Sequence, residues 1–190
     1  MVTEIFKNGK RKMEVETKEA WNPIGQDVKN GNVREYHGPI YWNYGYLPQT
    51  WEDPNETHPT LKVIGDNDPL DCLEIGETLI ETGSITSVKV LGVLAMVDEG
   101  ELDWKVLCVR ESEESKYPNG IDDVPDAVKD GIREWLRWYK TPDGKPLNNF
   151  GFDEEWLGEK EVLEVIEETN GAWKRLMAGK VQPDGLWLVV

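Results

Sequence analysis

The hydrophobic periodicity of the sequence changes partway along the chain. Residues 1 to about 110 are rich in glycine, proline and β-forming residues and contain short alternating runs, whereas residues 120–180 have helical spacing. A β region followed by helices predicts an α+β fold. With 190 residues the chain has the usual length of one domain, so we expect residues 1–190 to form a single domain.

Two strands are predicted at Val88–Val97 and Trp104–Val109, and the acidic segment 98–103 joins them into a hairpin. Asp103 and Lys105 are two residues apart at the start of the second strand. Their side chains should therefore leave the same face of the sheet. This placement lets two opposite charges point at one ligand.

Two amphipathic helices are predicted after the strands. The first begins near Val124, with Asp122 or Asp123 as its cap and Pro125 in its first turn, and the second covers about Glu159 to Met177. In each helix the apolar residues recur on one face, which indicates packing against the core. These residues are Val128, Ile132, Trp135, Leu136 and Tyr139 in the first helix, and Val162, Val165, Ile166, Trp173, Leu176 and Met177 in the second.

The net charge of −16 limits the partners of the chain. Such a charge repels nucleic acids and anionic membranes, so we expect neither as a partner. The longest apolar run, Val90–Val97, is far shorter than the roughly 20 residues of a membrane span, and no secretory signal is expected at Met1 to Lys12. Cys72 and Cys108 lack the spacing of a disulfide framework, which favours a reducing compartment.

Three carboxylates stand within the segment 66–71, which reads Asp-Asn-Asp-Pro-Leu-Asp. On extended backbone Asp66 and Asp68 project to one side, and Pro69 bends the chain so that Asp71 can reach the same centre. Clustered carboxylates repel one another unless cations or protons lie between them. Oxygen ligands at this density suit Mg²⁺ or Mn²⁺.

A solvated acidic turn is the alternative interpretation of this segment taken alone. An EF-hand loop does not fit, because Leu70 and Asp71 stand where a ligand and the turn glycine are required. A zinc site does not fit either, since no histidine or cysteine has ligand spacing. Solvated surface is likewise the alternative for the other charged groups, which are Asp98 with Asp103 and Lys12 with Glu14.

Together these motifs resemble the family I soluble inorganic pyrophosphatases. The pattern Asp-x-Asp-Pro-x-Asp at residues 66–71 is the signature of that family. The resemblance covers nearly the whole chain, and the segments 48–54 and 139–146 look like the eukaryotic branch. The other matching segments, in the family's order, are Lys12-Met13-Glu14, Asn22-Pro23-Ile24, Arg34, Asn43-Tyr44-Gly45, Asp98 to Lys105 and Tyr139-Lys140.

The resemblance implies an activity and a set of site residues. The implied reaction is hydrolysis of pyrophosphate to two orthophosphates by direct attack of a metal-activated water, with Asp68 as general base. The implied cofactor is Mg²⁺, for which Mn²⁺ or other divalent ions can substitute. The implied metal ligands are Asp66, Asp71, Asp103, Asp98 and Glu14, the substrate-binding residues are Lys12, Arg34, Tyr44, Lys105, Tyr139 and Lys140, and Glu4 fits a flanking acidic position.

The resemblance also implies an architecture: a compact OB-like five-stranded β-barrel with flanking α-helices, mostly C-terminal. A homo-oligomer is expected, with a dimer favoured. The expected compartment is the cytoplasm, or an organelle if the chain is cut from a longer precursor. One departure is that Ile40 occupies the position of the family's second tyrosine, and the neighbouring Tyr41 is not assigned to the site.

Two other functions fit part of the sequence. In a haloacid-dehalogenase-type phosphatase, Asp66 would be a nucleophile within an Asp-x-Asp motif. Leu70 replaces the threonine or valine of that motif, however, and the βαβ alternation of that fold is missing. A cation buffer would explain the acidic charge but not the basic residues of the matching segments.

Overall fold

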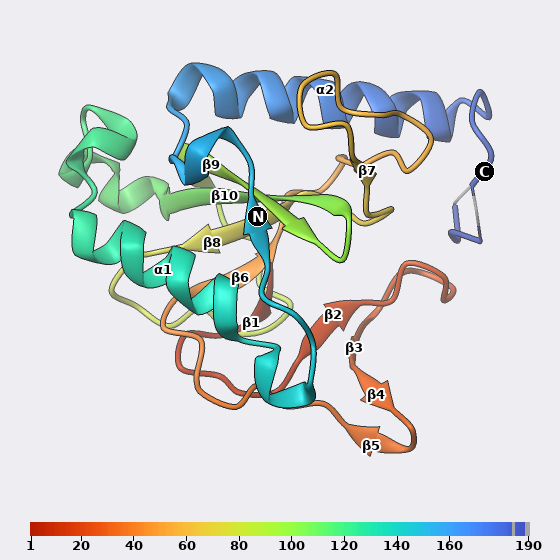
Figure 1. Cartoon of the computed structure of the whole chain (residues 1–190), viewed down its shortest axis with the longest axis horizontal. Coiled ribbons are helices and arrows are strands. Elements are labelled where there is room, and N and C mark those ends of the chain that lie inside the picture. Colours follow the sequence, from red (N-terminus) through yellow and green to blue (C-terminus); the bar gives the residue numbers. More distant parts are fainter. Residues whose placement is uncertain (184, 189–190) are drawn as a thin grey trace.

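The computed structural model describes residues 1–183 and 185–188. The strands are β1 (Val2–Ile5), β2 (Met13–Val15), β3 (Ile24–Gln26), β4 (Val28–Lys29), β5 (Asn32–Val33), β6 (Asn43–Tyr46), β7 (Ile64–Gly65), β8 (Asp71–Glu74), β9 (Val88–Asp98), β10 (Glu101–Arg110) and β11 (Asn149–Phe150). The main sheet has seven strands, in the order β1-β6-β8-β10-β9-β11, with β7 beside the start of β10 (Figure 1). Two small sheets pair β2 with β3 and β4 with β5.

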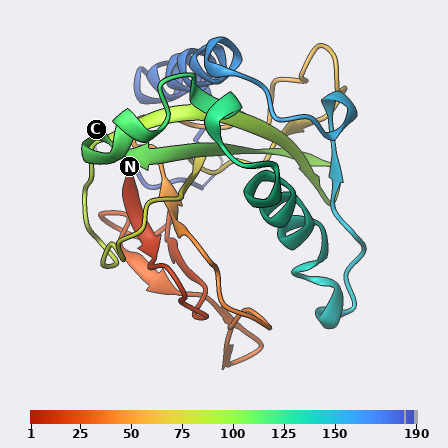
Figure 2. The ribbon, with the colours of Figure 1, turned by 90° about the vertical axis from the view of Figure 1, so that its left-hand side faces the viewer.

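Two α-helices flank the main sheet. They are α1 (Asp126–Trp138) and α2 (Glu159–Met177), and 3₁₀ turns stand at η1 (Glu111–Lys116), η2 (Gly120–Asp123), η3 (Thr141–Asp143) and η4 (Phe152–Glu154). Figure 2 shows the two helices on opposite sides of the long β9–β10 hairpin. Among the described residues, no helix combines the length and the apolar character that a membrane span requires.

The hairpin is longer than the sequence predicts. The pairing of β9 with β10 starts at Asp98 and Glu101, so only Glu99 and Gly100 form the turn. Both turn residues have positive φ, 51° and 98°, as in the tight turns whose twist matches that of the flanking strands. The expectation of a six-residue connection was therefore wrong, and Asp103 lies inside the strand.

The predicted bounds of the second helix are confirmed, whereas the start of the first helix differs. Its N-cap is Pro125, and the expected caps Asp122 and Asp123 lie in η2 instead. Asp123 accepts hydrogen bonds from the backbone and side-chain nitrogens of Asn119, at 2.5 and 3.1 Å. Because this carboxylate closes its own turn, it does not cap α1.

Alternation along β10 divides the core between the two faces of the sheet. Leu107 and Val109 join the apolar cluster that contains residues of α1, and Val106 and Cys108 join the cluster that contains residues of α2. Since side chains alternate, Lys105 leaves the sheet on the α1 side. The site is therefore built on that side of the sheet.

The α+β class is confirmed, but a closed five-stranded barrel is not. The path of paired strands is open, because β1 and β11 stand at its two ends and no pairing joins them within residues 1–183 and 185–188. The sheet is instead strongly curved (Figure 2).

Candidate active site

The residues predicted for the site line two adjoining cavities, with volumes of about 510 and 350 Å³. Arg34 and Lys140 line the smaller cavity, and the other ten predicted residues line the larger one. Tyr41 lines neither cavity and is 60% exposed, while Ile40 is buried in the core. All twelve predicted residues are thus brought together.

Lys105 is the central cation of the larger cavity. Its Nζ donates hydrogen bonds to Oδ1 and Oδ2 of Asp103, at 2.5 and 2.6 Å, and it also pairs with Asp71. Lys105 stands opposite Asp71 across the parallel strands β10 and β8, so the sheet register fixes this contact. Burial lowers the pKa of Lys105, but the two carboxylates outweigh burial and hold the pKa well above its ordinary value.

Tyr44 on β6 completes this arrangement. Its hydroxyl donates to Asp71 and accepts a hydrogen bond from Lys105 Nζ at 3.0 Å. Three neighbouring strands therefore meet at the same point of the cavity, where β6 contributes Tyr44, β8 contributes Asp71 and β10 contributes Lys105 with Asp103.

The loop between β7 and β8 carries Asp66 and Asp68 and is not extended. Asn67 has a φ of 73°, and the backbone nitrogen of Asp68 donates to Asp66 Oδ1 at 3.0 Å. The premise of an extended backbone was therefore wrong, although both carboxylates line the cavity. Trp51 Nε1 donates to Asn67 Oδ1 at 3.0 Å, and the backbone nitrogen of Glu52 donates to the Asp68 carbonyl at 2.9 Å, so the loop is anchored on both sides.

Gly65 lets this loop approach the segment that carries Glu52. A Cβ atom at position 65 would lie 2.4 Å from the carbonyl carbon of Glu52 and 2.5 Å from its oxygen. No side chain fits in that space, so the glycine is required for the close contact. Asp66, the next residue, is thereby brought beside Glu52.

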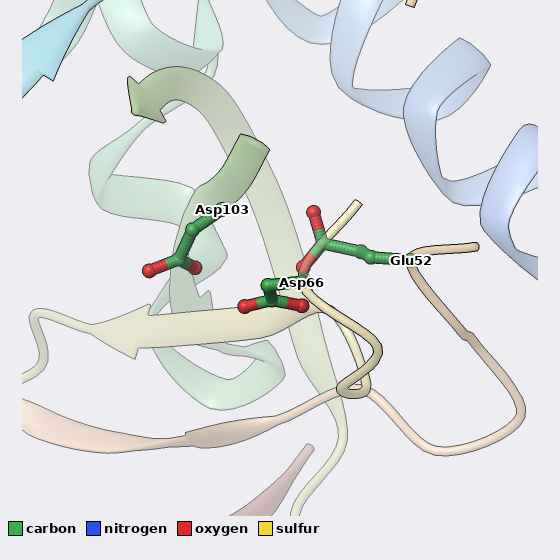
Figure 3. Close-up of side chains that lie close together, drawn as sticks. All are labelled: Glu52, Asp66 and Asp103. Carbon is green, nitrogen blue, oxygen red and sulfur yellow. The ribbon is translucent and has the colours of Figure 1, made fainter. Parts of the chain in front are cut away.

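Glu52, Asp66 and Asp103 form a compact carboxylate cluster. One oxygen from each lies within 4.8 Å of the others, and Figure 3 shows the three side chains converging. Glu52 Oε1 accepts a hydrogen bond from the backbone nitrogen of Trp104 at 3.0 Å, whereas Oε2 is buried and has no partner in the part of the chain that the structure describes. An orphaned buried oxygen among carboxylates fits the ligand set of a divalent cation.

The pKa values of this cluster agree with that interpretation. Burial, together with the neighbouring carboxylates, holds the pKa of Glu52 and of Asp66 well above the ordinary range. Burial also raises the pKa of Asp103 to about 7, although Lys105 opposes the shift. Because their pKa values are raised, these groups bind protons more readily than free carboxylates, and a bound cation would displace those protons.

Asp68 and Glu4 are further carboxylates of the larger cavity. Burial and the nearby Asp71 raise the pKa of Asp68 to about 6. Burial raises the pKa of Glu4 to about 8, and its Oε1 accepts a hydrogen bond from the backbone nitrogen of Val15 at 2.6 Å. Asp68 therefore has the pKa of a group that can accept a proton near neutrality.

The C-terminal end of α1 closes the site beside the β9–β10 turn. Tyr139 donates a hydrogen bond to Asp98 Oδ2 at 3.1 Å, and the buried ammonium of Lys140 pairs with Asp98 Oδ1. The Tyr139 ring stacks on Trp135, with centroids 5.2 Å apart and planes 3° from parallel. Helix packing thus positions both residues.

Asp27 was not predicted from the sequence but holds two of the predicted cations. It forms an ion pair with Arg34 and lies 3.4 Å from Lys12, which also pairs with Glu14. Glu52 was missed as well, although it lies in the segment 48–54 that matched the eukaryotic branch. The match of segment 48–54 to the eukaryotic branch is the one sequence pattern that could have identified Glu52. No matching segment contains Asp27.

Comparison with known proteins gives consistent matches. The family model described as inorganic pyrophosphatase matches residues 1–174. An inorganic pyrophosphatase of Candida glabrata is 48% identical over 190 residues, which cover 95% of this chain and 66% of that protein. A recombinant inorganic pyrophosphatase of Trypanosoma brucei brucei has a similar structure, with a TM-score of 0.92 and 41% identity over 98% of this chain and 55% of the other.

A third match was solved with a ligand. It is an N-terminally truncated vacuolar soluble pyrophosphatase of Trypanosoma cruzi in complex with PPi, with a TM-score of 0.88 and 42% identity over 92% of this chain and 68% of that chain. The present chain thus spans about two thirds of the length of curated relatives such as the Candida protein. These matches decide against the haloacid-dehalogenase-type alternative, and the chain belongs to the inorganic pyrophosphatase family.

Proposed function

We propose that the chain hydrolyses inorganic pyrophosphate to two orthophosphates. The observation that carries the proposal is the convergence of six predicted carboxylates and four predicted cations on two adjoining cavities. Such a mixture suits a polyanionic substrate that arrives with cations of its own. The inorganic pyrophosphatase relatives support the same activity.

The carboxylates would hold divalent ions, with Mg²⁺ as the proposed cofactor and Mn²⁺ as a substitute. Asp66, Asp71 and Asp103 would bind one ion, with Glu52 beside them, and the ligands for further ions are Asp98, Asp103, Glu14 and Asp71. Bound ions would neutralise phosphate charge and increase the acidity of water.

The other site residues have separate roles in this proposal. Asp68 accepts a proton from the attacking water, because its pKa of about 6 leaves it ionised at neutral pH while still basic. Lys12, Arg34, Lys105 and Lys140 bind phosphate oxygens, and the hydroxyls of Tyr44 and Tyr139 add hydrogen bonds. Lys140 and Lys105 are held in place by ion pairs in the absence of substrate.

The remaining expectations belong to the same proposal. Residues 1–190 act as one catalytic domain, the chain assembles as a homodimer, and its compartment is the cytoplasm or an organelle. Relatives whose names include chloroplastic forms support an organellar location as one option.

A phosphate-release assay tests the activity. Pyrophosphate, tripolyphosphate and a phosphomonoester are compared in the presence of Mg²⁺, Mn²⁺ and Zn²⁺. We expect selective hydrolysis of pyrophosphate with Mg²⁺ and none with a chelator. Preference for the phosphomonoester, or no release from pyrophosphate with any of the ions, would refute the proposal.

A further inference from the structure

Tyr36 lies at the junction of the larger cavity and a third cavity of about 340 Å³. Its ring packs edge-on against Trp135 and Tyr139, with centroid distances of 5.2 and 5.8 Å. Its backbone nitrogen donates to the Lys10 carbonyl at 2.7 Å. The phenol is therefore held in one orientation by aromatic packing and by the backbone.

The tyrosines Tyr36, Tyr44 and Tyr139 line the larger cavity beside the predicted phosphate-binding residues, and they differ in the hydrogen bonds of their hydroxyls. The hydroxyls of Tyr44 and Tyr139 donate to Asp71 and Asp98, respectively. By contrast, the Tyr36 hydroxyl makes no hydrogen bond to any residue within 1–183 and 185–188. Because the Tyr36 hydroxyl has no protein acceptor and its ring is held beside the cavity, the hydroxyl can donate a hydrogen bond to a bound molecule.

The lining of the two cavities places Tyr36 beside the predicted site. Lys12 and Tyr139 line both cavities together with Tyr36, and Lys105 and Asp71 line the larger one. All four belong to the predicted site. The phenol therefore shares its cavities with predicted phosphate-binding residues, and burial raises its pKa, so it stays protonated at neutral pH.

We propose that Tyr36 is a further substrate-binding residue, whose hydroxyl donates a hydrogen bond to a phosphate oxygen of the anion bound at Lys12. This inference rests on the proposed function, since it names a contact to the same substrate or product. A hydrogen bond to a charged phosphate oxygen is stronger than one between neutral groups. No protein group competes for this donor among the described residues.

The substitution Tyr36→Phe tests the proposal, because it removes the hydroxyl and keeps the stacked ring. We expect the KM for pyrophosphate and the Kd for orthophosphate in Mg²⁺ to rise about 10-fold to 100-fold. We expect kcat within about threefold of wild type, since the contact is made with bound substrate and transition state alike. Tyr41→Phe is the matched control, because Tyr41 is 60% exposed and lines none of the three cavities.

Calorimetric titration of orthophosphate in Mg²⁺ separates this contact from the proposed activity. Weaker phosphate binding by Tyr36→Phe, with unchanged melting temperature and unchanged binding by Tyr41→Phe, supports the contact even if wild type hydrolyses nothing. Phosphate binding within twofold of wild type, or an equal loss in Tyr41→Phe, would overturn it. A wild-type chain that binds no phosphate in Mg²⁺ overturns it too.

Discussion

Asp103 and Lys105 lie side by side on one face of β10, and the Lys105 Nζ is 2.5 Å from one carboxylate oxygen of Asp103 and 2.6 Å from the other. The same ammonium also pairs with Asp71. One buried lysine therefore balances two carboxylates in the metal-free chain. Its place between them also means that added cations would share these carboxylates with it.

Replacing Lys105 with Met should destabilise the metal-free chain by about 3–5 kcal/mol, because it leaves buried carboxylates without a partner. The loss should be smaller in Mg²⁺, which supplies the missing charge. Urea unfolding in EDTA and in Mg²⁺ measures both values. Lys160→Met is the control, since its side chain is 78% exposed; equal effects of the two substitutions would contradict the prediction.

Asp68→Asn should leave Mg²⁺ binding nearly unchanged and lower kcat by roughly 10²-fold to 10⁴-fold, because the amide cannot accept the proton of water. Calorimetry and the phosphate-release assay measure the two properties. Asp130→Asn on the exposed face of α1 serves as control. Near wild-type turnover of the Asp68→Asn variant would remove Asp68 from the role of base.

Glu52→Gln should weaken Mg²⁺ binding by roughly 10-fold to 100-fold. The amide oxygen can still accept the hydrogen bond from the backbone of Trp104, so the fold should persist, but the buried negative charge is lost. Isothermal titration with Mg²⁺ checks the affinity, and circular dichroism checks the fold. Glu56 is nearby and half-exposed, so the Glu56→Gln variant should bind Mg²⁺ like wild type. Wild-type Mg²⁺ affinity of the Glu52→Gln variant would show that Glu52 is not a metal ligand.

The stability of the metal-free chain should fall as pH rises from about 5 to about 8. The pKa values of Asp68, Asp103 and Glu4, about 6, 7 and 8, exceed their unfolded values, so the native state binds more protons than the unfolded state in this range. Stability that depends on those protons is lost as pH rises through each pKa.

Mg²⁺ should reverse that trend, because it replaces the protons on the clustered carboxylates. Thermal melts at pH 5, 6, 7 and 8, with EDTA and with Mg²⁺, measure the two slopes. A melting temperature that rises with pH in EDTA would show that the native carboxylates are not held protonated.

The residues that converge on the two cavities could be named from the sequence because their motifs keep a recognisable order along the chain. Lys12, Asp68 and Lys140 come from distant segments, and local periodicity does not predict that they lie close together. The family resemblance predicted that they belong to one site. Asp103 and Lys105 are different, since a strand period of two residues is enough to place them on one face.

Other features depended on packing that no short pattern encodes. Glu52 reaches Asp66 only because Gly65 leaves room for the backbone. The start of α1 was misplaced because Asp123 bonds Asn119, and a sequence cannot show which of two nearby turns an aspartate will close. That the sheet stays open was not predictable, since closure depends on long-range pairing rather than on local preference.

The contacts that hold the Asp66–Asp68 loop in place connect it to α2, which lies outside the site. Trp51, which donates to Asn67, packs its ring with Ala172 and Leu176 of α2, and its backbone nitrogen donates to the Thr169 carbonyl at 3.1 Å. The carboxylates are thus attached, through one indole, to a helix on the opposite side of the sheet. On heating, detachment of this helix would release the loop before the central strands separate, so inactivation would begin at a surface far from the chemistry.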